Sequence, residues 1–315
     1  MSRSIKSQRL TSTPAQTLVE MLKTRRPSFS LAVDYFCEDF LADLGGVFDH
    51  YGNYIVRVGR SRVLWSSHTD TVHRLGGRQK VVLCGDMLRL ATGETSNALG
   101  ADCSTGVWLM SEMIRAGVPG LYIFHANEEA GGVGSDYIAT KTPELLREVD
   151  FAIAFDRKGL DSVITHQMGR RCCSDAFAQS LARLLPGAYR LDETGSFTDT
   201  ANYADGYLVA ECTNISVGYF DQHSAKECQS LSHALALRET LLSFDETKLV
   251  LERSPGEPRE PWDRFEGGGF WSREPRRFRS LADYVAAYPD EVADLLEHYG
   301  LDLETVRDAI EGRAQ

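Results

Sequence analysis

The chain has 315 residues, of which 43% are hydrophobic, and this size suits one large α/β domain or two small ones. Its formal net charge of -11 argues against sequence-independent binding to nucleic acid or to an anionic membrane, because both require a basic surface. The seven cysteines are scattered and form no CxxC pair, so neither a disulfide framework nor a thiolate zinc site is indicated.

The first 22 residues contain basic side chains but no apolar run of the length that a signal peptide has. No stretch of the sequence is long and apolar enough to suggest a membrane span. Since no disulfide pattern is present either, the reducing cytoplasm is the expected location.

The first predicted elements are two helices and a β-hairpin. Pro14 follows Ser12-Thr13 and suits the first position of a helix. A second helix is expected from Ser30 to a glycine stop at residues 45–46. Turn residues at 51–53 lie between two short alternating runs, which predicts the hairpin. We interpret both helices as packing elements.

The run VLWSS at 63–67 predicts a buried strand that ends at His68-Thr69-Asp70. Open α/β sheets bind their ligands at the carboxyl ends of their strands. Residues two apart lie on one side of an extended segment, so His68 is a candidate metal ligand and Asp70 a candidate brace for its ring. The alternative is that His68 is an ordinary hydrogen-bonded loop residue.

Asp102 stands at the entry to a predicted helix. Residues 80–91 predict another hairpin with its turn at Gly85-Asp86, and a glycine-rich stretch then leads to an amphipathic helix through Val107 and Met110. Asp102 is therefore either a cap of this helix or a member of a site to which other acidic groups converge.

Two further strand-like runs end in carboxylates. The run LYIFHAN leads to Glu128-Glu129, and FAIAF leads to Asp156. Adjacent carboxylates in a low dielectric raise each other's pKa unless a cation neutralises them. The alternatives are a solvated acidic turn for Glu128-Glu129 and a surface ion pair of Asp156 with Arg157 or Lys158.

The next segment contains a short strand at 163–164 and an amphipathic helix around 177–185, followed by a predicted loop at 195–206. An apolar run then brings the chain to His223, and a helix at about 229–244 is expected to close the domain. His166 is a weaker candidate for contacting a substrate carboxylate or the oxyanion, and Tyr219 and the pair Thr198-Asp199 are weaker candidates for lining a pocket.

The domain organisation follows from composition. Residues 1–250 are predicted to form the catalytic domain, and 251–280 a linker or strap rich in proline, glycine and charge. Residues 281–315 have helical periodicity and are interpreted as a packing or oligomer-contact appendage without chemistry of its own.

The strand-end groups together predict a metal site. Two imidazoles and several carboxylates without a cysteine suit zinc, with cobalt or manganese as the other options. A bridging carboxylate allows two divalent ions to bind side by side, and one carboxylate remains to take a proton from water.

Five motifs in order also resemble the co-catalytic dizinc exopeptidases, the group that includes bacterial leucyl aminopeptidases and related aminoacylases and carboxypeptidases. The resemblance covers roughly Leu41 to Phe244. It is carried by SHTDTV at 67–72, LGADCSTG at 99–106, NEEAGGVGS at 127–135, FDRKG at 155–159 and SVGYFDQHSAKE at 216–227.

This resemblance implies one metal bound by His68, Asp102 and Asp156, and a second bound by Asp102, Glu129 and His223. It also implies that Glu128 is the general base and that Asp70 supports His68. A hydroxide bridging the two ions would then attack the substrate.

The sequence departs from this group in two places. Members often carry a second acidic residue or asparagine after the bridging aspartate, and a cis peptide bond joins the two residues. Here Cys103 follows Asp102, so the sequence does not indicate whether this peptide bond is cis or trans. Larger relatives insert a dimerisation domain before the last histidine, but only 66 residues, 157–222, separate Asp156 from His223. The expected fold is a single-domain three-layer α/β/α sandwich around a mixed, mostly parallel sheet.

The expected function is hydrolysis of a terminal peptide or amide bond in a small peptide or N-acyl amino acid. The alternatives are a single-zinc acyltransferase or cyclase of the same fold, and a metal-binding scaffold without activity. Association into a homo-oligomer is left open, as is recognition of the amino or the carboxyl terminus of the substrate. For a substrate carboxylate, the candidate cations are Arg157, Lys158, Arg170 and Arg171.

Overall fold

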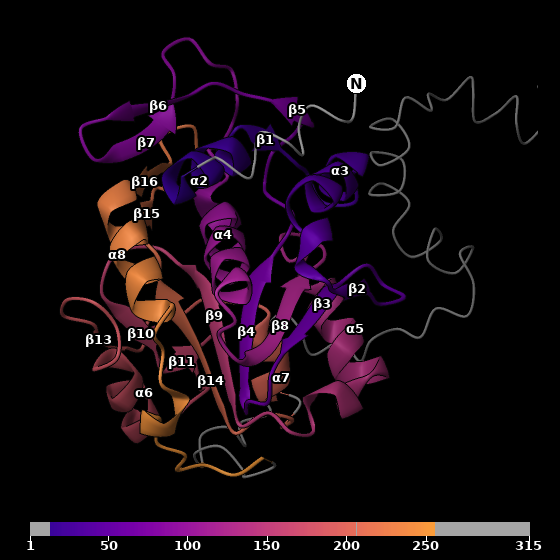
Figure 1. Ribbon diagram of the computed structural model, residues 1–315, viewed down its shortest axis with the longest axis vertical. Helices are drawn as coiled ribbons and strands as arrows, with labels where there is room; N and C mark the ends of the chain where they lie inside the picture. The colour runs from indigo at the N-terminus through magenta and orange to yellow at the C-terminus, as the bar shows by residue number, and fades with distance from the viewer. Residues whose placement is uncertain (1–12, 206, 256–315) are drawn as a thin grey trace, which may run out of the picture. The chain divides into compact units, whose positions relative to one another are not determined.

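The structure is a computed structural model that describes residues 13–205 and 207–255, and its centre is a mixed β-sheet (Figure 1). Within the described residues, eight strands have the order β13-β10-β14-β9-β4-β8-β3-β2. Parallel pairing joins β13 to β10, β14 to β9, β9 to β4 and β4 to β8, and the other neighbours are antiparallel. The strands span β2 Val47–Phe48, β3 Tyr54–Val58, β4 Val63–His68, β8 Gly120–His125, β9 Phe151–Arg157, β10 Ser162–Ile164, β13 Arg190–Asp192 and β14 Glu211–Ser216.

Helices cover both faces of this sheet, because alternate residues of the central strands are apolar on both sides. Trp65 and Phe155 belong to a core shared with helices on one face, whereas Leu64 and Ile123 belong to a second core on the other. The first face carries α2 Pro14–Leu22, α3 Leu31–Phe40, α4 Ala101–Arg115, α6 Asp175–Ala182 and α8 Leu231–Leu241; the second carries α5 Val133–Lys141 and α7 Thr200–Asp205. The predicted three-layer fold is confirmed.

Strand β4 lies near the middle of the sheet, between two parallel neighbours. Its last residue, His68, pairs in register with His125, the last residue of β8, and its other side pairs with β9. The carboxyl ends of three strands therefore meet at one edge of the sheet, where ligands bind in α/β folds.

A second sheet lies apart from the main one. The hairpin predicted at 80–91 is present as β6 and β7, and β7 pairs with β16, which pairs with β15. Small elements complete the described fold. The bounds are β6 Val81–Cys84, β7 Met87–Leu90, β15 Tyr219–Phe220, β16 Cys228–Ser230, β1 Thr24–Arg25, β5 Gly77–Arg78, β11 His166–Gln167, β12 Arg170–Arg171, η1 Ala42–Leu44, η2 Pro143–Leu146 and η3 Glu246–Lys248.

Helix α4 packs closely on the sheet, and its first turn is irregular. A Cβ atom on Gly106 would lie 2.5 Å from the Phe155 carbonyl oxygen, so only glycine permits this approach. The N-cap of α4 is Gly100, in the left-handed region, and not Asp102. The Asp102–Cys103 peptide bond is cis, which resolves the backbone geometry that the sequence left open. Asp102 therefore does not act as a helix cap.

Several expectations need correction. The stretch 195–206 was expected to be a loop, but residues 200–205 form α7, whose Tyr203 and Ala204 pack into the core. Helix α6 begins and ends two to three residues earlier than the predicted 177–185, and α8 is shorter than expected because it spans only 231–241. Between Asp156 and His223 the described residues form strands and helices of this same domain, in agreement with the predicted absence of an inserted domain.

Two predictions for the C-terminal part of the chain are not tested. Of the predicted linker at 251–280, only residues 251–255 belong to the described part, and the predicted helical appendage at 281–315 lies wholly outside it. Across residues 13–205 and 207–255, none of the helices combines the length and apolarity needed to cross a bilayer.

Candidate metal centre

The structure brings the six strand-end groups named above together at the carboxyl edge of β4, β8 and β9. His68 is the last residue of β4, Glu128 and Glu129 follow β8, and Asp156 is the penultimate residue of β9. Asp102 is supplied by the first turn of α4, and His223 by the turn after β15. Groups separated by up to 155 positions in the sequence thus converge through the order of the strands, the start of α4 and the turn after β15.

The Asp102 carboxylate lies between the two imidazoles. Its Oδ1 is 3.1 Å from Nε2 of His68, and its Oδ2 is 3.2 Å from Nε2 of His223. Ligand atoms bound at 2.0–2.1 Å around a tetrahedral zinc ion lie about 3.3 Å apart. The donor separations therefore fit a cation on each side of Asp102.

The two sides have separate further donors. On the first side, Asp156 Oδ1 is 3.4 Å from Nε2 of His68. On the second side, Glu129 Oε2 is 3.3 Å from Nε2 of His223, and its buried Oε1 has no hydrogen-bond partner. An unpartnered carboxylate oxygen in a buried site is costly unless a cation lies nearby. The donor set thus suits two divalent ions.

Asp70 lies behind His68, as the sequence suggested. Nδ1 of His68 is 3.1 Å from the Asp70 carbonyl oxygen and 3.4 Å from its Oδ1, so Nδ1 carries the ring hydrogen. The Asp70 carboxylate also accepts hydrogen bonds from the backbone N–H groups of Glu128 at 3.0 Å and Glu129 at 3.2 Å. One buried carboxylate therefore orients both the imidazole and the acidic pair.

With its hydrogen on Nδ1, His68 presents the Nε2 lone pair to the oxygens of Asp102 and Asp156. Acceptors that face one another in this way repel unless a proton or a cation lies between them. Burial lowers the pKa of His68, but the surrounding acidic groups, Cys103 and Asp102 foremost, outweigh it and hold this pKa well above its usual value. A divalent cation would supply the same positive charge.

Asp156 is not a surface residue paired with Arg157 or Lys158. Its Oδ2 accepts a hydrogen bond from Thr198 Oγ1 at 2.8 Å, and its Oδ1 accepts one from the Tyr219 hydroxyl at 3.3 Å. Burial, and then the nearby Asp102 charge, raise the pKa of Asp156 to about 7. Thr198 and Tyr219 therefore lie against the site, as the weaker candidates of the sequence analysis proposed.

Glu128 lies at the edge of the first side. Its Oε2 is 3.9 Å from Nε2 of His68, farther than the oxygens of Asp102 and Asp156. Burial raises the pKa of Glu128 well above its usual value. A carboxylate beside the donor set, with a raised pKa, is the arrangement that proton transfer from water requires.

Glu227 is the last residue of the motif at 216–227, four positions after His223, and the sequence assigned it no role. Its Oε2 accepts hydrogen bonds from the backbone N–H groups of Leu99 and Gly100 at 2.8 Å each, and its Oε1 accepts one from Asp102 at 3.0 Å. This buried carboxylate holds the loop that leads into α4. The spacing of four residues from His223 was the only feature of the sequence that could have pointed to a role for Glu227.

Arg26 also supports the site, and no pattern in the sequence indicated this role. Its guanidinium is fully buried, with Nε donating to the Thr69 carbonyl oxygen and Nη2 to Ser104 Oγ at 2.9 Å. It lies 4.0 Å from the centre of the Phe36 ring. Arg26 thus supports the residue between His68 and Asp70.

The remaining candidates lie outside the donor set. His125 is buried within β8, and its Nδ1 is 3.2 Å from Asp199 Oδ2. His166 begins β11, and neither it nor Asp199 belongs to the group of donors around Asp102. Cys103 Sγ comes near His68 and Asp156, but it donates to the Phe155 carbonyl oxygen at 3.2 Å.

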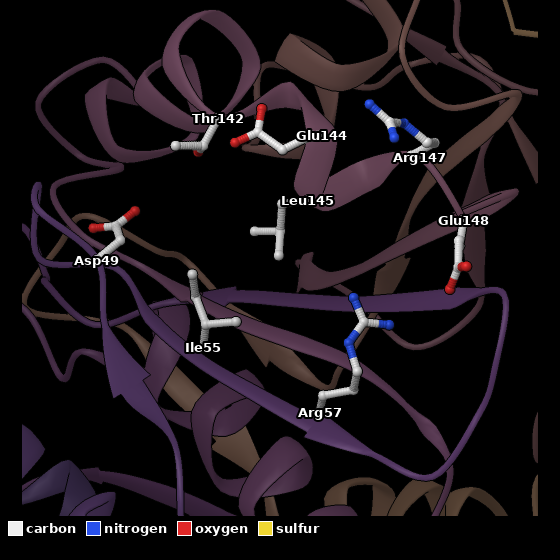
Figure 2. Close-up of a pocket in the computed structure, with 8 residues that line it drawn as sticks. All are labelled: Asp49, Ile55, Arg57, Thr142, Glu144, Leu145, Arg147 and Glu148. Carbon is white, nitrogen blue, oxygen red and sulfur yellow. The ribbon is translucent and has the colours of Figure 1, made fainter.

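A small hollow of about 70 Å³ opens above the donor set. Its wall contains the acidic groups Asp102, Glu128, Glu129 and Asp156 together with Arg157, Lys158, Ser196, Phe197, Tyr219, Gln222 and His223. A larger hollow of about 510 Å³ lies elsewhere, between β3 and the segment around η2 (Figure 2). The side chains around the larger hollow include no imidazole or thiol, whereas the smaller hollow contains His223 and four carboxylates.

Comparison with known proteins supports the fold. The sequence matches no protein-family model and no curated protein. Among solved structures, aminopeptidase PepT from Bacillus cereus aligns with a TM-score of 0.58 and 13% identity over 73% of this chain and 96% of that one. A tripeptidase from Staphylococcus aureus aligns with a TM-score of 0.57 and 13% identity over 73% of this chain and 96% of that one. The Pyrococcus horikoshii TET1 peptidase aligns with a TM-score of 0.55 and 14% identity over 74% of this chain and 100% of that one. That peptidase can assemble into a tetrahedron or an octahedral shell.

Proposed function

We propose that this chain is a metal-dependent hydrolase that removes a terminal residue or acyl group from a small peptide or N-acyl amino acid. The observation that carries the proposal is the position of Asp102, with one carboxylate oxygen facing His68 and the other facing His223. The fold shared with solved aminopeptidases and a tripeptidase supports the same reaction class.

In this proposal, His68, Asp102 and Asp156 hold one cation, and Asp102, Glu129 and His223 hold the other. Two imidazoles with hard carboxylate oxygens favour zinc, and they also suit cobalt and manganese. When bound, the two cations would polarise the scissile carbonyl and lower the pKa of a water molecule from 15.7 towards about 7.

Two residues of the chain have separate roles in this reaction. Glu128 takes the proton from the attacking water and returns it to the leaving nitrogen, for which its raised pKa is suited. Asp70 keeps the hydrogen of His68 on Nδ1 and orients the backbone of Glu128. The hollow of about 70 Å³ admits a small terminal group of the substrate.

The test is an assay of the full chain loaded in turn with zinc, cobalt and manganese. Aminoacyl, N-acyl and dipeptide substrates are supplied, and bound metal is counted per chain. We expect two metal equivalents and turnover of at least one substrate class.

The matched variant is Glu128→Gln, which keeps the shape of the side chain but cannot accept the proton. It should fold and retain metal, and its turnover should fall by at least a hundredfold. Activity near that of the parent would exclude Glu128 as the base, and a single metal equivalent would exclude the two-cation arrangement.

A further inference from the structure

The hollow above the donor set contains two cationic side chains that the proposed chemistry does not use. Arg157 is the last residue of β9, next to Asp156, and Lys158 follows it. Both belong to the wall of the hollow, which otherwise contains polar, aromatic and acidic groups.

None of the carboxylates in the wall of the hollow is left to pair with Arg157 or Lys158. The carboxylates in its wall are Asp102, Glu128, Glu129 and Asp156, and all have a proposed task at the cations or in proton transfer. Two divalent ions would carry as much positive charge as these carboxylates carry negative charge. Arg157 pairs with Asp192, which lies outside the wall, so Lys158 is the positive charge that remains, and within the described wall no carboxylate is left to bind an ammonium group.

Arg157 is fixed in place from outside the hollow. Its Nη2 donates to Thr194 Oγ1 at 2.8 Å and lies 3.3 Å from Asp192 Oδ2, next to the end of β13. Its Nε is buried and has no hydrogen-bond partner, and the side chain is 14% exposed. The guanidinium is therefore held rigidly against the wall, with its hydrogen-bonding capacity only partly used.

Lys158 stands on a backbone segment that is held on both sides. Its carbonyl oxygen accepts a hydrogen bond from Ser216 Oγ at 2.7 Å, and the N–H of Gly159 donates to the Tyr219 carbonyl oxygen at 2.8 Å. The side chain is exposed, and no carboxylate of the described residues lies within 4.0 Å of its ammonium. An ammonium in this position is available to an anionic ligand.

The other cations considered from the sequence are engaged elsewhere. Arg170 Nη1 lies 3.6 Å from Asp205, and Arg171 Nη1 lies 2.7 Å from Asp175 on α6. Neither belongs to the wall of the hollow. Of the four cations considered from the sequence, only Arg157 and Lys158 therefore contribute to the wall of the hollow. Their positions in the sequence did not distinguish them from Arg170 and Arg171.

We propose that Arg157 and Lys158 bind the free carboxylate of the residue on the leaving side of the scissile bond. This inference rests on the proposed function and narrows its substrate class to peptides with a free C-terminus and to N-acyl amino acids. A guanidinium and an ammonium on adjacent residues suit a carboxylate, which accepts hydrogen bonds through both oxygens.

The test uses matched substrates and the metal-loaded full chain. Alanyl-alanine carries the C-terminal carboxylate, alanyl-alanine amide lacks it, and glutamyl-alanine amide carries a carboxylate only on its side chain. We expect a KM for the dipeptide at least tenfold below that for either amide. Lys158→Gln should raise the KM for the dipeptide about tenfold, leave kcat nearly unchanged, and leave the amide almost unaffected.

Lys141→Gln is the matched control, because it removes one positive charge from the exposed end of α5, outside the hollow. It should leave all kinetic constants unchanged. Arg157→Lys is a second variant that keeps the charge but loses the planar fork, and it should also raise the KM for the dipeptide. Calorimetric titration of Glu128→Gln with N-acetyl-leucine, with and without Lys158→Gln, reports binding independently of turnover.

The outcomes separate the inference from the proposed function. Failure to cleave any of the substrates would contradict the proposed function itself. Equal KM values for the dipeptide and its amide, or a Lys158→Gln variant that behaves as Lys141→Gln does, would overturn the inference and leave the hydrolase intact. Preference for glutamyl-alanine amide would assign the two cations to a side-chain carboxylate and would also overturn the inference as stated.

Discussion

Glu227 accepts a hydrogen bond from the backbone N–H of Asp102 at 3.0 Å, across a sequence separation of 125 residues. The same carboxylate accepts the N–H groups of Leu99 and Gly100. The segment that carries His223 therefore also sets the backbone of the residue between the two imidazoles. A contact of this kind makes the two halves of the donor set depend on one another.

The first prediction concerns this contact. Glu227→Gln replaces one acceptor oxygen by an NH₂ group, so at least one of three buried N–H groups loses its partner. An unsatisfied buried donor costs about 1–3 kcal/mol, and urea unfolding should show a loss of that size. Metal content should fall together with the free energy of unfolding. Glu38→Gln, on the exposed surface of α3, is the control and should match the parent; equal stability of the two variants would contradict the role of Glu227.

A second prediction follows from the shared carboxylate of Asp102. Asp102→Asn weakens the donor on both sides, so the variant should lose both metal equivalents, whereas His223→Ala should lose only one. Ligand binding stabilises the folded state by about 2.7 kcal/mol at a hundredfold excess over Kd. Returning zinc to the chelated parent should therefore raise its Tm, and Asp102→Asn should show no rise. Plasma mass spectrometry after dialysis counts the metal, and two retained equivalents in Asp102→Asn would refute the bridge.

The sequence predicted the strand ends well because they have a local signature. The apolar runs before His68, Glu128 and Asp156 are long enough to identify buried strands. Parallel neighbours then bring their carboxyl ends to one edge, so the approach of these side chains could be expected without coordinates. The apolar run before His223 forms β14, which is parallel to β9, but His223 itself stands in the turn after β15, and its place beside Asp102 was implied only by the resemblance.

The supporting contacts could not be predicted, because both partners are polar and far apart in the chain. Arg26 and Thr69 are 43 residues apart, and the segment around Arg26 is too short to show any period. Asp199 lies just before α7, a six-residue helix that resembled a loop because its sequence, TANYAD, has little apolar periodicity. Only its packing against the sheet makes this segment helical.

Asp199 leads to a prediction about pH. Burial raises its pKa to about 8, and its oxygens have no hydrogen-bond partner, although His125 Nδ1 lies 3.2 Å away. In the unfolded chain this carboxyl ionises near pH 3.9. The unfolded state therefore releases the proton first, and the metal-free protein loses stability as the pH rises from about 4 to about 8.

Asp199→Asn cannot ionise and should lack this part of the pH dependence. Urea unfolding of the chelated parent and variant at about pH 5 and about pH 8 should show a difference in stability that grows with pH in favour of the variant. Parallel curves for the two proteins would show that Asp199 ionises normally in the folded state.

A fourth prediction concerns Arg26, whose guanidinium donates to Thr69 and Ser104. Arg26→Met fills a similar volume but leaves these acceptors unpaired, and hydrogen bonds to charged groups contribute about 1.5–3 kcal/mol each. Since two such bonds are lost, we expect a loss of about 3–6 kcal/mol in chemical unfolding and weaker metal retention. Arg78→Met removes an exposed ion pair with Glu20 and should cost less than about 1 kcal/mol; equal losses would contradict the supporting role of Arg26.

The wall of the small hollow is built from two kinds of segment. Most donors stand at strand ends or on α4, and His223 stands in a turn beside Gln222, whereas Ser196 and Phe197 lie in a stretch that belongs to neither helix nor strand and carries no donor. Loop side chains can be exchanged without disturbing a buried sheet. Under the proposed function, a laboratory selection that varies only Ser196 and Phe197 should therefore redirect the chain to new acyl groups while its donor set is inherited unchanged.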